Sequence, residues 1–166
     1  MTKMSAVKKF LTYILPLLLL LALIFPVWNR ALGSSRIYET FADVFRSVLP
    51  HASRHAFDVT YIVLRKMLHF FTYGLLAFLF YRAFRDGQRP FWSKRTGVQA
   101  AAAAIAYGFV DEFLQSFVPN RFGSPFDWAV DTAGILTVIV LLSWMGGRQH
   151  ADPHSQPGPA RPDRRA

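Results

Sequence analysis

The chain has 166 residues, of which 52% are hydrophobic and 16% aromatic, and it carries a formal net charge of +9. This length suits one domain. A basic protein can bind nucleic acid, but here the positive side chains lie between long apolar runs and in the tails, as in membrane proteins that contact anionic lipid. There is no cysteine, which excludes disulfides and thiolate metal sites. We therefore expect a membrane protein that does not bind nucleic acid.

Four apolar runs are predicted to be transmembrane helices, because each approaches the about 20 residues that cross about 30 Å of hydrocarbon. They are residues 10–27, 67–84, 97–117 and 126–145. Further apolar residues precede the second run, so its helix is expected to start earlier and to hold Lys66 in its first turns. The predicted fold is an all-α bundle of four transmembrane helices, with residues 1–145 as the membrane domain.

The first run has two competing interpretations. Two lysines precede it and small residues follow at 31–33, as in a secretory signal peptide. Trp28 and Arg30 crowd that cleavage site and the run is long, so a retained span is the better prediction. Pro16 and Pro26 are tolerated in a membrane helix and are expected to kink it.

The segments between the runs predict the orientation and one further helix. Lysines and arginines precede the first run, lie in the loop between the second and third, and follow the fourth, which predicts a cytoplasmic N-terminus and a cytoplasmic C-terminus. In the loop after the first run, apolar residues recur at helical spacing up to Pro50: Ile37, Phe41, Val44, Phe45 and Val48. This amphipathic helix is expected to lie on the membrane surface or to cover the bundle. Residues 146–166, rich in proline and arginine, are predicted to be a disordered tail.

Polar residues share the faces of the last three runs on which small residues also lie. The second run groups Lys66, His69 and Tyr73. The third groups Ala100, Ala104, Gly108, Glu112 and Gln115, and the fourth groups Asp127, Asp131 and Gly134. Small residues are typical of membrane helix interfaces, so these faces are predicted to point inward.

The polar residues are also predicted to lie at one depth. Glu112 is about 22 Å from the cytoplasmic end of its run at 1.5 Å per residue, and His69 reaches a similar height. The groups expected to converge on the outer third of the bundle are Lys66, His69, Glu112, Gln115, Arg121, Asp127 and Asp131. Ionisable groups cost several kcal/mol at membrane depth unless paired or hydrated, so the cluster predicts a functional site.

Three spaced motifs occur in this part of the chain. They comprise Lys66, His69, Phe70 and Tyr73; Asp111, Glu112 and Gln115; and Arg121, Asp127 and Gly134. In this order they resemble the motifs of the VanZ-like family of small bacterial membrane proteins, over residues 66–142. Asp131 stands where that family has asparagine, which keeps an acceptor and adds a charge. The resemblance implies a cell-envelope protein, and the family's namesake is associated with low-level teicoplanin resistance.

A structural and a functional interpretation of the polar residues stay open. In the structural one, Lys66 pairs with Glu112 or Asp127, and Arg121 pairs with Asp127 or Asp131, to hold the helices in register. In the functional one, the cations bind phosphate or carboxylate, while the acids and the histidine move protons or bind a divalent cation. The spacing matches no recognised metal motif, so the metal stays unknown.

We favour the functional interpretation, because small-residue packing would hold such a bundle with fewer charges. The candidate catalytic residues are Lys66, His69, Glu112 and Asp127. The candidate ligand-binding residues are Tyr73, Asp111, Gln115, Arg121 and Asp131. The leading hypothesis is a binding or resistance protein that holds a lipid-linked wall precursor or a glycopeptide at the outer leaflet. The alternative is a membrane-embedded enzyme acting on a phosphorylated lipid, and a proton-coupled transporter is less favoured.

Overall fold

A computed structural model describes residues 5–26, 35–86, 91–117 and 124–150. Those residues form only helices and turns, with no strand, as predicted. The α-helices are α1 (Ala6–Lys9), α2 (Leu15–Pro26), α3 (Ser35–Val48), α4 (Arg54–Arg85), α5 (Lys94–Gln115) and α6 (Pro125–His150).

Three helical segments in the described part of the chain, rather than four, are long and apolar enough to cross a membrane. They are Ala6–Ile24, Arg54–Arg85 and Pro125–Arg148. Helix α5 is the predicted span that falls outside this group. It is rich in alanine, which is only weakly apolar, and it carries charged residues near both ends.

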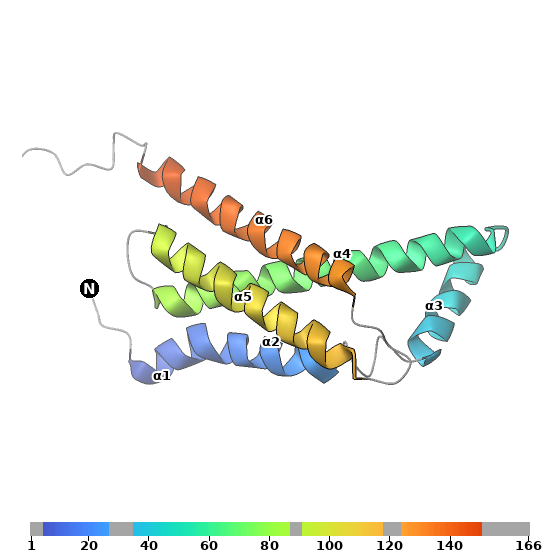
Figure 1. Cartoon of the computed structure of the whole chain (residues 1–166), viewed down its shortest axis with the longest axis horizontal. Coiled ribbons are helices and arrows are strands. Elements are labelled where there is room, and N and C mark those ends of the chain that lie inside the picture. The colour runs from blue at the N-terminus through green and yellow to red at the C-terminus, as the bar shows by residue number, and fades with distance from the viewer. Residues whose placement is uncertain (1–4, 27–34, 87–90, 118–123, 151–166) are drawn as a thin grey trace, which may run out of the picture.

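Helices α4, α5 and α6 pack against one another, and α2 lies along α4 (Figure 1). Their shared core contains Tyr73, Leu76, Ala77, Ala104 and Ile135, none of which is exposed. The face of α5 toward this core is lined by small residues, including Ala100 and Gly108. Because small side chains let helix axes approach closely, α5 fits against α4 and α6 despite its modest apolarity.

The closest contact between α4 and α6 depends on a glycine. A β-carbon added at Gly134 would lie 2.1 Å from the carbonyl oxygen of Phe70, which is inside any allowed contact. Gly74, one turn further along α4, also faces Gly134 across the same crossing. The backbones therefore touch here, and the crossing brings the polar faces of both helices together.

The first span is a continuous helix with one irregular turn. A π-helical turn at Phe10–Ile14 joins α1 to α2. Pro16 follows it directly and has no N–H to donate to the carbonyl of Thr12. That carbonyl instead accepts a hydrogen bond of 3.4 Å from the guanidinium of Arg82 in α4. The predicted irregularity thus lies before Pro16, and it helps to attach the first helix to the bundle.

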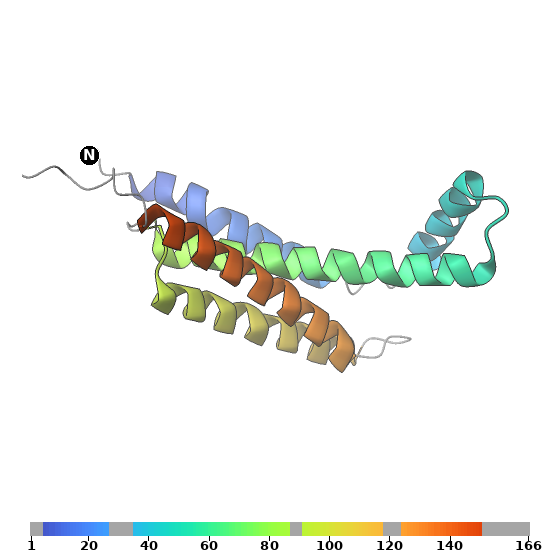
Figure 2. The same cartoon turned by 90° about the horizontal axis from the view of Figure 1, so that it is seen from above.

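Helix α4 extends well beyond the other helices (Figures 1 and 2). It begins at Arg54 because the Ser53 side chain accepts a hydrogen bond from the Ala56 N–H, which caps the helix. Its 32 residues give it a length of about 48 Å, against about 30 Å of hydrocarbon. The start before the apolar run at 67–84 is confirmed, but Lys66 lies in the fourth turn of α4 and not in its first turns, because the helix begins at Arg54.

The amphipathic helix predicted in the first loop is α3, but it does not cover the bundle. It packs against the first turns of α4, at the end farthest from α5 and α6 (Figure 2). Its buried side chains are Ala42 and Phe45, and they meet Phe57 of α4. The prediction that it covers the bundle was wrong, because α3 packs on the first turns of α4 and those turns lie beyond the ends of α5 and α6. We call α3 and the part of α4 before Arg65 the arm.

At the opposite end of the bundle, α6 continues to His150, past the predicted boundary at 145. Trp92 packs on two glycines, Gly97 and Gly146, and its ring stacks on that of Tyr81 with 5.4 Å between the ring centres. The remainder of the predicted tail, residues 151–166, lies outside the described residues.

Candidate functional site

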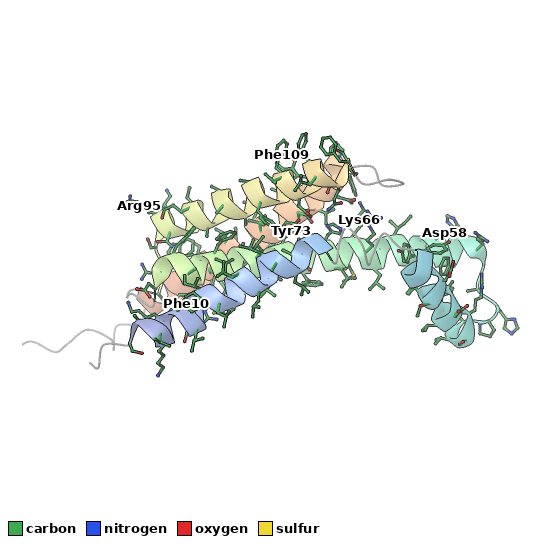
Figure 3. All side chains as sticks on the ribbon, turned by 90° about the horizontal axis from the view of Figure 1, so that it is seen from below. Phe10, Asp58, Lys66, Tyr73, Arg95 and Phe109 are labelled. Atoms are coloured by element: carbon green, nitrogen blue, oxygen red, sulfur yellow. The ribbon has the colours of Figure 1, made fainter. Side chains whose placement is uncertain are left out.

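The buried polar residues gather at one end of the bundle, where α5 ends and α6 begins. Figure 3 shows Tyr73 inside the bundle and Lys66 near the point where α4 leaves it. Six polar or charged residues are buried in the described chain: His69, Asp111, Glu112, Gln115, Asp127 and Asp131. All six come from the last three helices, and we call this end of the bundle the polar end.

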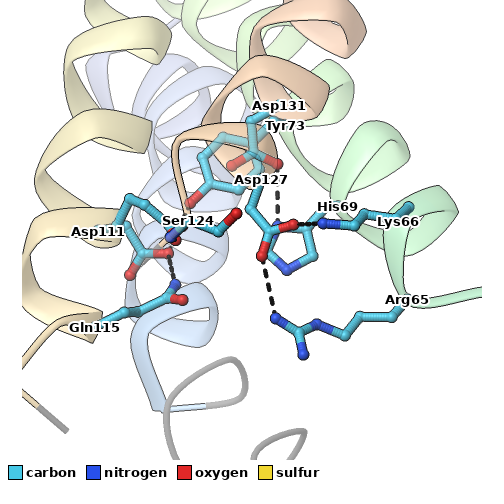
Figure 4. Close-up of polar contacts among 10 residues, drawn as sticks. Arg65, Lys66, His69, Tyr73, Asp111, Gln115, Ser124, Asp127 and Asp131 are labelled. Carbon is cyan, nitrogen blue, oxygen red and sulfur yellow. Dashed lines mark hydrogen bonds and ion pairs between the residues drawn. The ribbon is translucent and has the colours of Figure 1, made fainter. Parts of the chain in front are cut away.

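Asp127, in the first turn of α6, accepts from two cations of α4. Its carboxylate lies 3.1 Å from the guanidinium of Arg65 and also contacts the ammonium of Lys66 (Figure 4). The Lys66 ammonium also lies 4.8 Å from the ring centre of Phe126, a cation–π distance. The aspartate is buried, whereas the side chains of Arg65 and Lys66 keep 33% and 25% of their surface exposed. The two cations therefore form the rim of the polar end.

His69 and Asp131 form a second pair, deeper between the same helices. Nδ1 of His69 lies 3.0 Å from the Asp131 carboxylate, and neither side chain is more than 1% exposed. The imidazole stacks on the ring of Tyr73 at 6.2 Å. A carboxylate at Nδ1 orients an imidazole and favours a proton on that nitrogen, the arrangement found in many general bases.

Asp111 links α4 and α5. One of its oxygens accepts hydrogen bonds from the Tyr73 hydroxyl at 2.7 Å and from the Gln115 amide at 2.8 Å. All three residues are buried. Tyr73 also packs against Gly108, where a β-carbon would lie 3.2 Å from its ring. This network fixes the height of α5 against α4.

Glu112 links the end of α5 to the start of α6. Its carboxylate accepts a hydrogen bond from the backbone N–H of Ser124, immediately before α6. The Ser124 carbonyl in turn accepts the first hydrogen bonds of that helix, including 2.8 Å from the Asp127 N–H. Pro125 occupies the first helical position, where its missing N–H costs nothing. Glu112 thus positions the turn that carries Asp127.

Several buried polar atoms of the polar end have no partner among the described residues. They are one oxygen each of Asp111, Glu112 and Asp131, and Nε of Arg65. Within the described ranges, no three histidine, aspartate or glutamate side chains are grouped so as to hold a metal ion. A buried polar atom without a hydrogen-bond partner raises the free energy of the folded protein, so these four atoms require a physical explanation.

The structure agrees with most of the predicted geometry of the site. The predicted faces of α4, α5 and α6 all point inward, and their polar residues meet at one end. Lys66 pairs with Asp127, one of its two expected partners. Asp131 pairs with His69, which the spacing did not suggest, because the two lie on different helices. Arg121 lies outside the described residues.

Arg65 has a larger part than the sequence suggested. Its neighbour Lys66 belongs to a recognisable motif, whereas Arg65 lies outside that motif. The two side chains nevertheless share Asp127. The sequence contained one signal for this role of Arg65. Adjacent residues of a helix point about 100° apart, so both can reach one acceptor at a helix crossing.

The family assignment rests on a comparison with models of known protein families. The VanZ/LLP1 model matches residues 10–146. This chain belongs to the VanZ/LLP1 family. The match includes the first helix and α3 as well as residues 66–142, where the motifs lie. No curated protein and no solved structure matches the chain significantly.

Family membership and helix composition point the same way. This VanZ/LLP1 chain has three helical segments suited to crossing a membrane, and all three fall largely within the matched residues. Together these findings indicate a membrane protein. The buried charges of the polar end lie on two of those segments and on α5 between them.

Proposed function

We propose that this VanZ/LLP1 protein spans the bacterial inner membrane four times, with both termini in the cytoplasm. Helix α5 is then the fourth span. Its 22 residues cover about 33 Å, and it packs between two helices that are apolar enough to span. Burial of its polar face against α4 and α6 removes the need for a uniformly apolar surface.

The polar end then faces the outside, where the protein binds the phosphorylated head group of a lipid. The observation that carries this proposal is the pair of rim cations, Arg65 and Lys66. Both contact the buried Asp127, yet their side chains stay partly exposed. Arginine and lysine are the usual donors to phosphate, arginine as a planar fork and lysine as a point charge.

The surroundings of the rim favour a lipid over a soluble phosphate. Met67 and Leu68 follow the cations in the sequence, Phe126 lies against Lys66, and all three side chains are exposed. In a membrane these side chains would contact acyl chains while the cations reach the head-group layer. A lipid-linked wall precursor has both a hydrocarbon chain and a phosphate, which would connect the site to the cell envelope.

A second candidate function, an enzyme that acts on the same phosphorylated lipid, is favoured by one observation. The buried His69–Asp131 pair has the form of an oriented general base. It lies next to Lys66 on α4, so a bound phosphate would be within its neighbourhood. A proton-coupled transporter is less favoured, because the buried polar groups of the described residues are confined to the polar end.

Lipid binding to the purified protein tests the proposed function. Native mass spectrometry of the protein in detergent would compare phosphatidic acid with diacylglycerol, which lacks the phosphate. We expect the phosphorylated lipid to bind and Arg65→Gln with Lys66→Gln to lose it. Arg95→Gln, an exposed arginine at the other end of α5, is the matched control. Equal binding of both lipids, or unchanged binding by the double variant, would refute the proposal.

A turnover assay on the same lipid separates the two candidates. Purified protein would be incubated with the phosphorylated lipid, with and without Mg²⁺, and the products followed by mass spectrometry. Turnover that disappears in His69→Gln, with binding retained, would establish the enzyme. Binding without turnover would leave the binding protein.

A further inference from the structure

We infer that the ligand of the polar end carries a protonated amine as well as a phosphate, as an aminophospholipid or an aminated lipid-linked sugar phosphate does. This inference rests on the proposed function and names the chemical class of its ligand. It comes from a mismatch within the site: a donor at the rim lacks an acceptor, and acceptors further inside lack donors.

The unsatisfied acceptors are three carboxylate oxygens in one region. Asp131, Asp111 and Glu112 are 1%, 3% and 8% exposed, and each has one oxygen without a partner among the described residues. Asp131 interacts electrostatically with two like charges, Asp111 and Glu112, and with one opposite charge, Lys66. Buried carboxylates that interact in this way repel one another, and each unsatisfied oxygen loses its hydration without replacement.

The charges of the described residues give the same result. The site contains four carboxylates, those of Asp111, Glu112, Asp127 and Asp131, and two permanent cations, Arg65 and Lys66. Both cations are placed on Asp127, at the rim. Even with His69 protonated on Asp131, the four carboxylates and three cations leave the site as a whole with one uncompensated negative charge. Hydroxyl groups of a ligand would donate hydrogen bonds but would add no positive charge.

An ammonium group supplies both the hydrogen-bond donors and the positive charge that the inner carboxylates lack. It has three N–H donors and one positive charge, so it can donate to an unsatisfied carboxylate oxygen and offset the excess negative charge. The Arg65 side chain is 33% exposed, and its buried Nε has no acceptor among the described residues, so the guanidinium keeps donors for a phosphate. Phosphate and amine are joined by only a few bonds in an aminophospholipid, so one head group can reach both the rim and the inner carboxylates.

The test compares ligands that differ in the amine alone. Native mass spectrometry would measure binding of phosphatidylethanolamine, phosphatidylglycerol and phosphatidic acid to the full chain, with N-acetylated phosphatidylethanolamine as the blocked amine. We expect the free amine to bind about tenfold more tightly than the acetylated lipid, the effect of a charge-assisted hydrogen bond. Asp131→Asn should remove that preference while binding to phosphatidic acid is kept, and Arg65→Gln with Lys66→Gln should weaken all phosphorylated lipids.

Each other outcome overturns the inference in a recognisable way. Equal binding with and without the free amine would refute the amine but leave phosphate binding intact. If lipid binding required Mg²⁺ and did not depend on the amine, the inner carboxylates would be a site for a divalent cation. If the wild-type protein bound none of these lipids, both this inference and the proposed function would be refuted. If Asp131→Asn fails to accumulate, Glu112→Gln provides the second variant, because glutamine keeps the acceptor for the Ser124 N–H.

Discussion

At the scale of single residues, the two aspartates of α6 are in different electrostatic settings. Asp127 joins two cations of α4 and is the acceptor that compensates both. Among the described residues, Asp131 pairs with His69 and lies near the carboxylates of Asp111 and Glu112. A buried charge that compensates others is expensive to remove, whereas one that adds to an excess of like charge is not.

We expect Asp127→Asn to destabilise the protein more than Asp131→Asn does. Loss of the Asp127 charge leaves Arg65 and Lys66 uncompensated, at about 1–3 kcal/mol, since both are partly hydrated. Asp131→Asn keeps an acceptor for His69 and places an amide donor near two carboxylates, so stability should be unchanged or higher. Thermal unfolding in detergent measures both variants. An equal loss in the two would show that Asp131 is needed as an anion for folding.

At the scale of helices, the crossing of α4 and α6 and the contact of α3 with α4 do separate tasks. The crossing brings the polar faces together because Gly134 lets the two backbones touch. The contact of α3 with α4 is made by a small aromatic cluster far from the polar end. The ring centre of Phe57 lies 5.3 Å from that of Phe45 and 5.2 Å from that of Tyr38. Since these contacts share no side chain, each can be weakened without the other.

The crossing predicts a sharp contrast between two glycines of α6. Gly134→Ala would force α6 away from the carbonyl of Phe70, with an expected loss of about 1–3 kcal/mol from overpacking. Gly147→Ala meets nothing within 4 Å, so its better helix propensity should stabilise the helix by up to about 1 kcal/mol. Thermal unfolding of both variants measures the difference. A tolerated Gly134→Ala would mean that the helices cross elsewhere.

The arm predicts a local effect. Phe57→Ala removes the centre of the cluster that holds α3, and an aromatic truncation of this kind costs about 3–5 kcal/mol. Hydrogen exchange should therefore become faster in residues 35–48, with little change in residues 94–115. Phe71→Ala, at an exposed position further along α4, is the matched control. A uniform change over the whole chain would show that the arm and the bundle unfold together.

At the scale of the whole molecule, the ends of the helices divide into two levels. The end of α4 and the start of α5 lie at one level, and the polar end lies at the other (Figure 1). From Lys66 to Arg85, α4 covers about 30 Å, the thickness of the hydrocarbon, so the arm extends about 18 Å beyond it. The proposed topology places the arm and the polar end outside the cell together.

Cysteine labelling tests that topology, because the natural chain has no cysteine. A membrane-impermeant maleimide should label Val48→Cys in the arm and Ser116→Cys at the end of α5 in cells with a permeable outer membrane. Lys94→Cys and Gly147→Cys should react only after the inner membrane is opened. All four positions are exposed. Labelling of Lys94→Cys and Ser116→Cys from the same side would mean that α5 does not cross the membrane.

The properties that the sequence determined are those with a local physical cause. Apolar runs and helical spacing predicted the four long helices, the amphipathic α3 up to its end before Pro50, and the inward faces that carry His69, Glu112 and Asp131. The period of 3.6 residues acts along one helix, so it places side chains on a face without reference to the rest of the chain. The family motifs lie on those same faces.

The pairing of the polar residues was decided only by the tertiary structure. Whether Asp127 meets Lys66 or Arg121, and whether Asp131 meets an arginine or His69, depends on the height and angle at which α6 crosses α4. That crossing is determined by the backbone contact at Gly134, between segments more than sixty residues apart. The position of α3 depends likewise on where α4 begins, through the Ser53 cap. Such contacts involve two distant segments, whereas helical periodicity describes one segment at a time.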